Sequence, residues 1–496
     1  MELRHELDMA HEEIARLKAE LSQFKRTAKE KPFGSSTPSS EQLVKSNTPV
    51  EKSERKGGAK PGHPGNCRKR FTPEEIDETV EHEHPAVCPD CGAPLVDAGV
   101  ETRDGYELHP YKARRVVHRI HYGFCTHCKK KHAVKPGGYL PKSICSNQLI
   151  ASVLTSHYGD GQPIGSIARR IGIGKSTLIG MEHTIAELLK ASDEWIKEQY
   201  RLSLYKHADE TKWRCRGKNT YTWIFNTDNI AIFRCADSRK AEVAMDIFGQ
   251  APHIGILCCD RFPGYYKAWK GKIQHCFEHL KRATLDIIDE NKNSKACRVF
   301  AEGLAKLLRK AMRLDAKSKT DEDYYRQAAE IQKKIEELTD YNDPHPAIAN
   351  IQQIFRENHE RLYHWVTDRK VRPENNLAES GLRPQVIARK VSFGSQSEGG
   401  MVTRERHISM VTTMKLRGID PERRIREVLD LIASGKIDKK DCAKFLYAQD
   451  LASEIAGVSI SVSPKARPLA TASRLGLRPR GTLRNKFLRR ISVSAP

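Results

Sequence analysis

Three acidic residues, far apart in the chain, stand where a metal-dependent nuclease would need them. Asp209 follows an apolar segment, Asp260 follows Ile-Leu-Cys-Cys, and Glu379 lies in Asn-Asn-Leu-Ala-Glu-Ser-Gly-Leu-Arg-Pro. Each aspartate is expected to end a strand, and the glutamate to lie on a short helix that Pro373 starts and Pro384 ends. Phosphodiester chemistry with two divalent ions needs a few carboxylates held rigidly together. The three acids therefore predict a Mg²⁺ or Mn²⁺ site.

Two of these acids have rivals nearby. Glu210 adjoins Asp209, but adjacent strand residues point to opposite faces, so only one can face the site, and we prefer Asp209. Glu374 lies five residues before Glu379 and would point elsewhere on the helix. Residues three or four positions from Glu379 share its face and could support the carboxylate or hold a phosphate. They are Asn375, Asn376 and Arg383. Capping and surface solvation are their alternative roles.

Apolar segments around the acids predict an α/β core at 200–400. The expected strands are 202–209, 221–225, 230–234 and 253–260, with a helix at 241–248. This order of three strands, a helix, a strand and then helices matches a ribonuclease-H-like core, in which the first acid lies on the first strand and the second follows the fourth. Neighbouring parallel strands lie about 4.8 Å apart, so both aspartates could share a pair of metal ions.

A charged helical insertion is expected at about 280–370, between the second and third acids. Cys276 and His279 lie where it begins. His279 could support the site, and the pair could bind a metal. A structural role for the pair is the simpler alternative.

Two Cys-x-x-Cys motifs predict a zinc-binding module at 80–135. The four cysteines are Cys88, Cys91, Cys125 and Cys128. Each motif can place two thiolates on one ion, and the two motifs together complete a tetrahedron. His127 and His132 are spare ligands. Because four thiolates close the coordination shell, the Zn²⁺ would be structural; free thiols in two turns are the alternative.

Residues 143–192 predict a helix-turn-helix domain. One apolar face at 164–171 is broken by Gly-Ile-Gly, and a second helix follows. The side chains that would face phosphate or groove are Arg169, Arg170, Lys175 and Thr177. An ordinary helical hairpin is the alternative. The Gly-Lys-Ser-Thr run lacks the glycine spacing and the preceding strand of a phosphate loop, so nucleotide binding is not expected.

The segments at the two ends of the chain have distinct compositions. Residues 1–26 carry an unbroken a/d heptad pattern, which predicts a dimerising coiled coil or, alternatively, a helix folded back on its own chain. Residues 27–79 are expected to be a flexible basic linker, 401–450 a C-terminal helical region, and 451–496 a disordered basic tail. The whole is thus a multidomain α+β protein.

Composition points to a nucleic-acid partner. The 85 lysines and arginines against 63 acids give a net charge of +22, although an ordinary basic soluble protein is the alternative. Thirteen cysteines, an odd number, favour reduced cytoplasmic thiols over a disulfide framework. No apolar run reaches transmembrane length, and the first residues do not resemble a signal peptide.

Taken in order, the motifs resemble the large transposase of the insertion-sequence-66 family, a DDE-type enzyme. The resemblance covers about 1–435, and its pieces are Lys-Pro-Phe-Gly-Ser-Ser after the heptads, Gly-Ala-Lys-Pro-Gly-His-Pro-Gly, the paired cysteine motifs, His207–Trp213, Cys259-Asp260 with Tyr265 and Tyr266, Cys276-x-x-His279 followed by Arg282, Glu374–Pro384, and Arg389-Lys390 with Phe393-x-Gly-Ser395. Ala59 and Pro64 are small departures, and the segment after about 450 has no counterpart in the family.

The resemblance implies the triad Asp209, Asp260 and Glu379, and cut-and-join chemistry at the terminal inverted repeats of an insertion sequence. It also implies target DNA as a partner, a homodimer or larger assembly, small companion proteins, and a bacterial cytoplasm with association to the nucleoid. Two alternatives stay open. One is a non-catalytic DNA-binding protein derived from a transposase, and the other is a nuclease that hydrolyses DNA without strand transfer.

Overall fold

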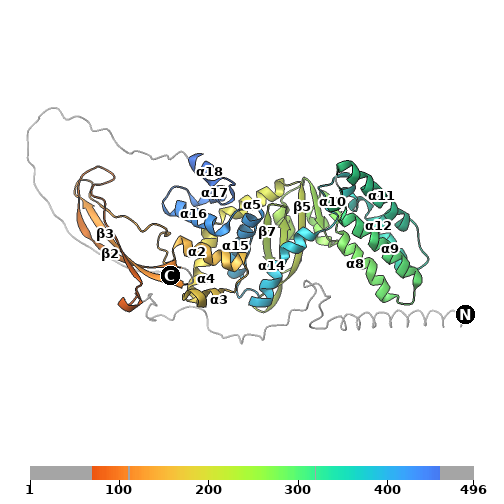
Figure 1. Cartoon of the computed structure of the whole chain (residues 1–496), viewed down its shortest axis with the longest axis horizontal. Coiled ribbons are helices and arrows are strands. Elements are labelled where there is room, and N and C mark those ends of the chain that lie inside the picture. Colours follow the sequence, from red (N-terminus) through yellow and green to blue (C-terminus); the bar gives the residue numbers. More distant parts are fainter. Residues whose placement is uncertain (1–69, 110–111, 319, 458–496) are drawn as a thin grey trace, which may run out of the picture.

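The computed structural model describes residues 70–109, 112–318 and 320–457. Figure 1 shows an elongated molecule with a strand arm at one end, a sheet covered by helices in the middle, and a bundle of helices at the other end. The predicted coiled coil at 1–26 lies outside the described residues, as do most of the predicted linker and tail.

The arm is built mainly from two long paired strands. Its elements are η1 (Pro73–Glu75), β1 (Glu78–His82), β2 (Leu95–His109), β3 (Lys112–Cys125) and β4 (Lys130–His132). β3 pairs antiparallel with β2 and β4, and parallel with β1. The arm includes all four cysteines of the predicted zinc module, and β1 begins within the segment predicted to be linker.

The central sheet has five strands in the order β7-β6-β5-β8-β9. They are β5 (Tyr205–Cys215), β6 (Lys218–Asn226), β7 (Ala231–Ala236), β8 (Ile256–Cys259) and β9 (Lys272–His275), with α6 (Ala241–Phe248) and α7 (Pro263–Ala268) between the later strands. β5, β6 and β7 pair antiparallel, whereas β8 and β9 run parallel to β5. β9 was not predicted from the sequence, because four residues give little periodicity.

The prediction that the first strand ends at Asp209 was wrong. β5 continues to Cys215, still paired with β6. The residues after Asp209 are polar, but Glu210 is only 7% exposed, and its carboxylate has partners elsewhere in the fold. Tertiary contacts thus allow the strand to run on through polar sequence.

Helices that precede the sheet in the chain and helices that follow it pack together with the sheet. They are α2 (Asn147–Leu154), η2 (Thr155–Gly159), α3 (Ile164–Ile171), α4 (Lys175–Leu188), α5 (Ala191–Leu202), α14 (Asn376–Ser392), α15 (Glu398–Leu416), α16 (Pro421–Ala433), η4 (Lys439–Asp441), α17 (Cys442–Tyr447) and α18 (Leu451–Gly457). One hydrophobic cluster joins them to the sheet, with Leu149, Ile185, Phe225 and Val428 among its members. The predicted helical segments 143–192 and 401–450 therefore share a core with the sheet, and helix extends to 457 in the segment predicted to be a tail.

The expected bounds of the helix that carries Glu379 were wrong. α14 begins at Asn376 rather than at Pro373, and it runs through Pro384 to Ser392. A proline inside a helix removes the N–H that would bond the carbonyl four residues earlier, here that of Ser380. Ser380 is exposed, so water can satisfy that carbonyl and the helix can continue.

The segment expected to be a helical insertion folds into helices with a core of their own. They are α8 (Phe277–Glu290), α9 (Lys295–Met312), α10 (Leu314–Lys317), α11 (Asp321–Thr339), α12 (Pro346–Glu357), η3 (His359–Arg361) and α13 (His364–Thr367). Their core contains Phe277, Leu304, Ile331 and Trp365.

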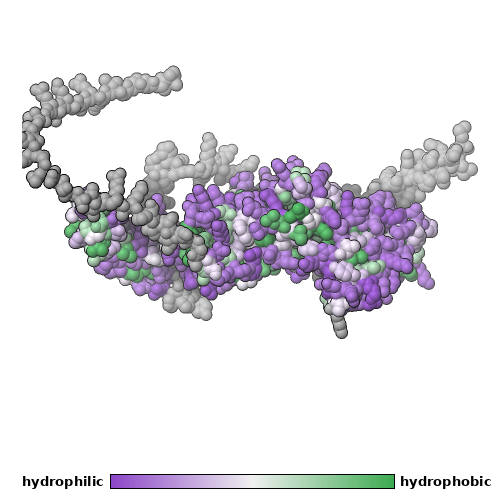
Figure 2. All heavy atoms as spheres, turned by 90° about the horizontal axis from the view of Figure 1, so that it is seen from above, coloured by the Kyte–Doolittle hydropathy of each residue, from purple (hydrophilic) through white to green (hydrophobic). Residues whose placement is uncertain are grey.

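Hydrophilic residues cover most of the face of the molecule that Figure 2 shows. In the described part of the chain no helix is both long and apolar enough to cross a membrane.

Candidate active site

Asp209 lies on the face of the sheet that α14 covers. It is directly opposite Ile224 on β6, and residues directly opposite each other on antiparallel strands share a face. A methyl group on Gly381 of α14 would collide with Cδ1 of Ile224, so this face packs closely against α14. β8 pairs with β5 only as far as His207, which leaves Asp209 two residues beyond that pairing.

Glu210 faces the opposite side. It lies across from Trp223, whose ring contacts Tyr265 of α7 at a centroid distance of 5.8 Å. Tyr265 donates a hydrogen bond of 2.7 Å to Glu210 Oε2, and Arg239 forms an ion pair with the other oxygen. Neither partner was predicted from the sequence. These two contacts hold the Glu210 carboxylate on the face of the sheet opposite to that of Asp209.

Asp260 follows directly after β8, at the carboxyl end of a strand that neighbours β5. Its Oδ1 accepts a hydrogen bond of 2.9 Å from the backbone N–H of Phe262, which holds the turn before α7. The side chain is partly exposed. Solvent can therefore reach the carboxylate while the turn restricts its position.

Glu379 lies in the first turn of α14, and Asn375 ties that turn to β5. Asn375 is fully buried. Its Nδ2 donates to the carbonyl of Ala208 (2.8 Å), and its Oδ1 lies 3.0 Å from Nδ1 of His207. The same residue accepts the backbone N–H of Glu379 through its carbonyl at 3.1 Å. One side chain therefore sets where Glu379 lies relative to Asp209.

The other expected supporting residues differ in their surroundings. Nδ1 of His279 on α8 lies 3.7 Å from Oε1 of Glu379, and Arg282 lies 3.6 Å from Oε2. Asn376 and Arg383 are exposed and form no side-chain hydrogen bond or ion pair with any residue that the structure describes. The structure thus brings His279, but neither Asn376 nor Arg383, against the glutamate.

The rival Glu374 precedes α14, and its backbone carbonyl accepts a contact of 3.4 Å from the thiol of Cys258. Burial raises the pKa of its carboxyl. Glu374 is therefore held outside the helix that carries Glu379.

The acids near Asp209 affect its pKa. Burial raises the pKa of Asp209 well above its ordinary range, and the negative charges of Glu210, Asp260 and Glu379 raise it further. A divalent cation would offset this repulsion at Asp209. Oε1 of Glu379 is also buried without a hydrogen-bond partner. The chemistry of this donor set therefore fits a hard divalent ion such as Mg²⁺.

The spacing of the three acids bears on how such ions would be held. Among the described residues, Asp209, Asp260 and Glu379 do not form a group whose ligand atoms all lie within 4.8 Å of one another. Two ions, each bound by part of the set, need less convergence than a single ion bound by all three.

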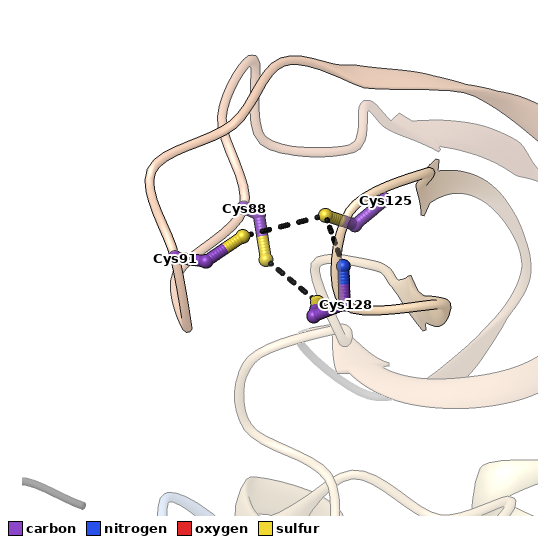
Figure 3. Close-up of side chains that lie close together, drawn as sticks. All are labelled: Cys88, Cys91, Cys125 and Cys128. Carbon is purple, nitrogen blue, oxygen red and sulfur yellow. Dashed lines mark hydrogen bonds between the residues drawn. The ribbon is translucent and has the colours of Figure 1, made fainter. Parts of the chain in front are cut away.

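The four cysteines of the arm converge from two loops, as Figure 3 shows. All four sulfurs lie within 4.8 Å of one another; Cys88 and Cys128 are 3.4 Å apart, and Cys91 and Cys125 are 3.5 Å apart. A tetrahedral Zn²⁺ with Zn–S bonds of about 2.3 Å would separate its sulfurs by about 3.8 Å. The cluster could therefore bind Zn²⁺ with small adjustments.

The thiol of Cys125 has a lowered pKa, which favours its thiolate form. The backbone N–H of Cys128 donates to it at 3.4 Å, and this hydrogen bond, together with those from the other three thiols, lowers the pKa of Cys125 to about 6. Of the spare histidines, Nε2 of His132 lies 3.4 Å from the sulfur of Cys88.

The predicted helix-turn-helix corresponds to α3 and α4. Gly172 ends α3 with a φ of 76°, and α4 begins after Gly174. The four residues expected to face DNA lie near this turn: Arg169, Arg170 and Lys175 are exposed, and Thr177 is partly exposed. On its other side α4 packs against α15, where Nδ1 of His183 lies 2.6 Å from the hydroxyl of Thr403.

Comparison with known proteins adds the family. The model described as Transposase IS66 family matches residues 142–403, which is more than half of the chain. The uncharacterized protein y4qI of Sinorhizobium fredii (strain NBRC 101917 / NGR234) is 26% identical over 422 residues, covering 77% of each chain. The matched span includes the sheet, α14 and all three acids. This chain belongs to the IS66 family of transposases.

Proposed function

We propose that the chain is a DDE transposase that binds the terminal inverted repeats of an insertion sequence, cuts DNA strands and joins them to a target. The observation that carries this proposal is the placement of three acids on neighbouring elements: Asp209 on β5, Asp260 directly after β8, and Glu379 in the first turn of α14. Burial raises the pKa of Asp209, and the charges of Glu210, Asp260 and Glu379 raise it further. The strand order, with an antiparallel triplet followed by two parallel strands, supports a ribonuclease-H-like core.

In this proposal Asp209, Asp260 and Glu379 hold two Mg²⁺ or Mn²⁺ ions. When bound there, the ions would supply neutralisation of the scissile phosphate, activation of the attacking hydroxyl and stabilisation of the leaving 3′ oxygen. Asn375 acts as a positioning residue, because its hydrogen bonds fix the start of α14 against β5. Exposed Arg383, one turn after Glu379, is free to contact a DNA phosphate.

The remaining parts would bind and organise DNA. A structural Zn²⁺ on the four cysteines of the arm would join its two loops. The exposed side chains around the α3–α4 turn would contact phosphate or groove. The net charge of +22 supports a polyanion partner. We further propose a homodimer or larger assembly on the two element ends, with companion proteins of the same element, in a bacterial cytoplasm close to the nucleoid.

The decisive experiment follows a labelled duplex that carries the element's own ends, with and without Mg²⁺. Wild type is compared with Asp209→Asn, Asp260→Asn and Glu379→Gln. Glu374→Gln is the matched control, because Glu374 lies five residues from Glu379 but outside α14. We expect metal-dependent cutting and joining in wild type and the control only, with DNA binding intact in all proteins.

Each of the other outcomes would support a different function for this chain. DNA binding without any chemistry in wild type would replace the transposase with a DNA-binding relative. Cutting without joining would indicate a nuclease. Full activity in any of the three acid variants would remove that acid from the proposed site.

A further inference from the structure

A second group of metal-ligating side chains adjoins the proposed active site and shares Glu379 with it. The ligand atoms of Cys276, His279 and Glu379 all lie within 4.8 Å of one another. Cys276 caps the start of α8, His279 lies one turn into that helix, and Glu379 approaches from α14. One thiol, one imidazole and one carboxylate thus come together from two elements.

The donor atoms at the centre of this group lack other partners. Nδ1 of His279 and Oε1 of Glu379 are both buried without a hydrogen bond, and they lie 3.7 Å apart. Two ligands on a tetrahedral zinc ion with bonds of about 2.1 Å are separated by about 3.4 Å. The sulfur of Cys276 is held in place by the backbone N–H of Asn375 at 3.1 Å. A small movement of the three side chains toward one another would let all three ligand atoms bind one ion.

We infer that Cys276, His279 and Glu379 form a site for a soft or borderline divalent ion of the Zn²⁺ class, separate from the four-cysteine cluster. Thiolate and imidazole select such ions over Mg²⁺, which prefers oxygen ligands. Binding would release the thiol proton of Cys276 to solvent. With three protein ligands, the ion would keep its fourth position for water.

The site has a functional consequence that rests on the proposed function. An ion held by Cys276 and His279 would take Oε1 of Glu379, leaving only Oε2 for an ion shared with Asp209 and Asp260. The site at Asp209 and Asp260 would thereby lose a ligand oxygen. Zn²⁺ would therefore inhibit Mg²⁺-dependent cleavage. Arg282 opposes Zn²⁺ binding, because its guanidinium lies 3.6 Å from Oε2 of Glu379. Its side chain is 41% exposed and can move aside.

The test counts zinc per chain in the purified full-length protein after removal of loosely held metal with a weak chelator. We expect two ions in wild type and one in Cys276→Ser and in His279→Gln. The second variant guards against misfolding, because His279 is 34% exposed, whereas Cys276 is buried. Arg282→Gln should bind the second ion more tightly.

Cys297→Ser is the matched control. Cys297 is a buried thiol 3.5 Å from a ring nitrogen of His345, but no third ligand joins that pair among the described residues. This variant should keep two ions. Cobalt added to protein with one zinc per chain should give a thiolate charge-transfer band in wild type that Cys276→Ser lacks.

One zinc per chain in wild type, or two in both Cys276→Ser and His279→Gln, would overturn the inference. The inhibitory effect is measured by adding Zn²⁺ during Mg²⁺-dependent cleavage, with each variant compared with its own zinc-free rate. If no protein cleaves DNA at all, the proposed function fails, while the zinc counts still decide whether this site exists.

Discussion

Replacing Asn375 with alanine should loosen the start of α14 and displace Glu379. The side chain is fully buried, and it bridges α14 to two consecutive residues of β5. Because Nδ2 donates to the carbonyl of Ala208, Oδ1 must accept from His207. His207 therefore carries its proton on Nδ1, and burial lowers the pKa of its ring to about 4, which keeps it neutral. Alanine would leave both β5 groups without their partner.

The expected size follows from these contacts. Each lost hydrogen bond removes about 1 kcal/mol, and each buried group left unpaired costs about 1–3 kcal/mol. Ala208 and His207 are 0% and 4% exposed, so water has little access to either. Counting the two groups left unpaired, we expect the variant to lose about 2–6 kcal/mol of unfolding free energy. A displacement of Glu379 approaching 1 Å would slow cleavage by about 100-fold.

Asn375→Ala and Asn376→Ala should be compared by denaturant unfolding and by Mg²⁺-dependent cleavage of the labelled duplex. Asn376 is the same residue type one position later, but its side chain is exposed. Its variant should change stability by less than about 0.5 kcal/mol and retain most of the activity. Equal effects of the two substitutions, or a stable Asn375→Ala protein with wild-type cleavage, would refute the argument that this bridge positions Glu379.

Three further predictions concern metal and pH. Cys125→Ser should lower the zinc content by one ion per chain and increase hydrogen exchange in the arm, measured by mass spectrometry; unchanged zinc would argue against the four-thiolate site. Burial raises the pKa of Glu182 from its ordinary 4.5 to about 8, so its ionised form is disfavoured in the fold and stability falls as pH rises through this range. Glu182→Gln should therefore gain unfolding free energy over wild type as pH rises from 4.5 to 8, by up to about 5 kcal/mol, and a difference that does not change with pH would contradict this. Asp209 likewise has a raised pKa, so metal-free Asp209→Asn should melt above wild type at neutral pH, and Mg²⁺ should stabilise wild type more than the variant; the reverse order would count against the carboxylate cluster.

The sequence by itself determined the features that depend on neighbours along the chain. Two Cys-x-x-Cys motifs predicted the four-cysteine cluster, because a short turn between two cysteines directs both sulfurs to one side. Alternation along a strand predicted that Asp209 and Glu210 face opposite sides of the sheet, and their registers with Ile224 and Trp223 fit this. The choice of Asp209 as the metal ligand stays a prediction. Family membership also followed from motifs in order, and the family match supports it.

Only the tertiary structure decided the features that depend on distant partners. Asn375 and Asn376 are indistinguishable in sequence, yet only Asn375 meets His207, which lies 168 residues away along the chain. The same reason explains why β5 runs through Glu210, whose partners come from α7 and from Arg239, and why Pro384 lies inside α14. It also explains why Glu379 meets His279 rather than Arg383. Local pattern sets which groups a segment offers, whereas burial and hydrogen bonding between segments decide which of those groups find a partner.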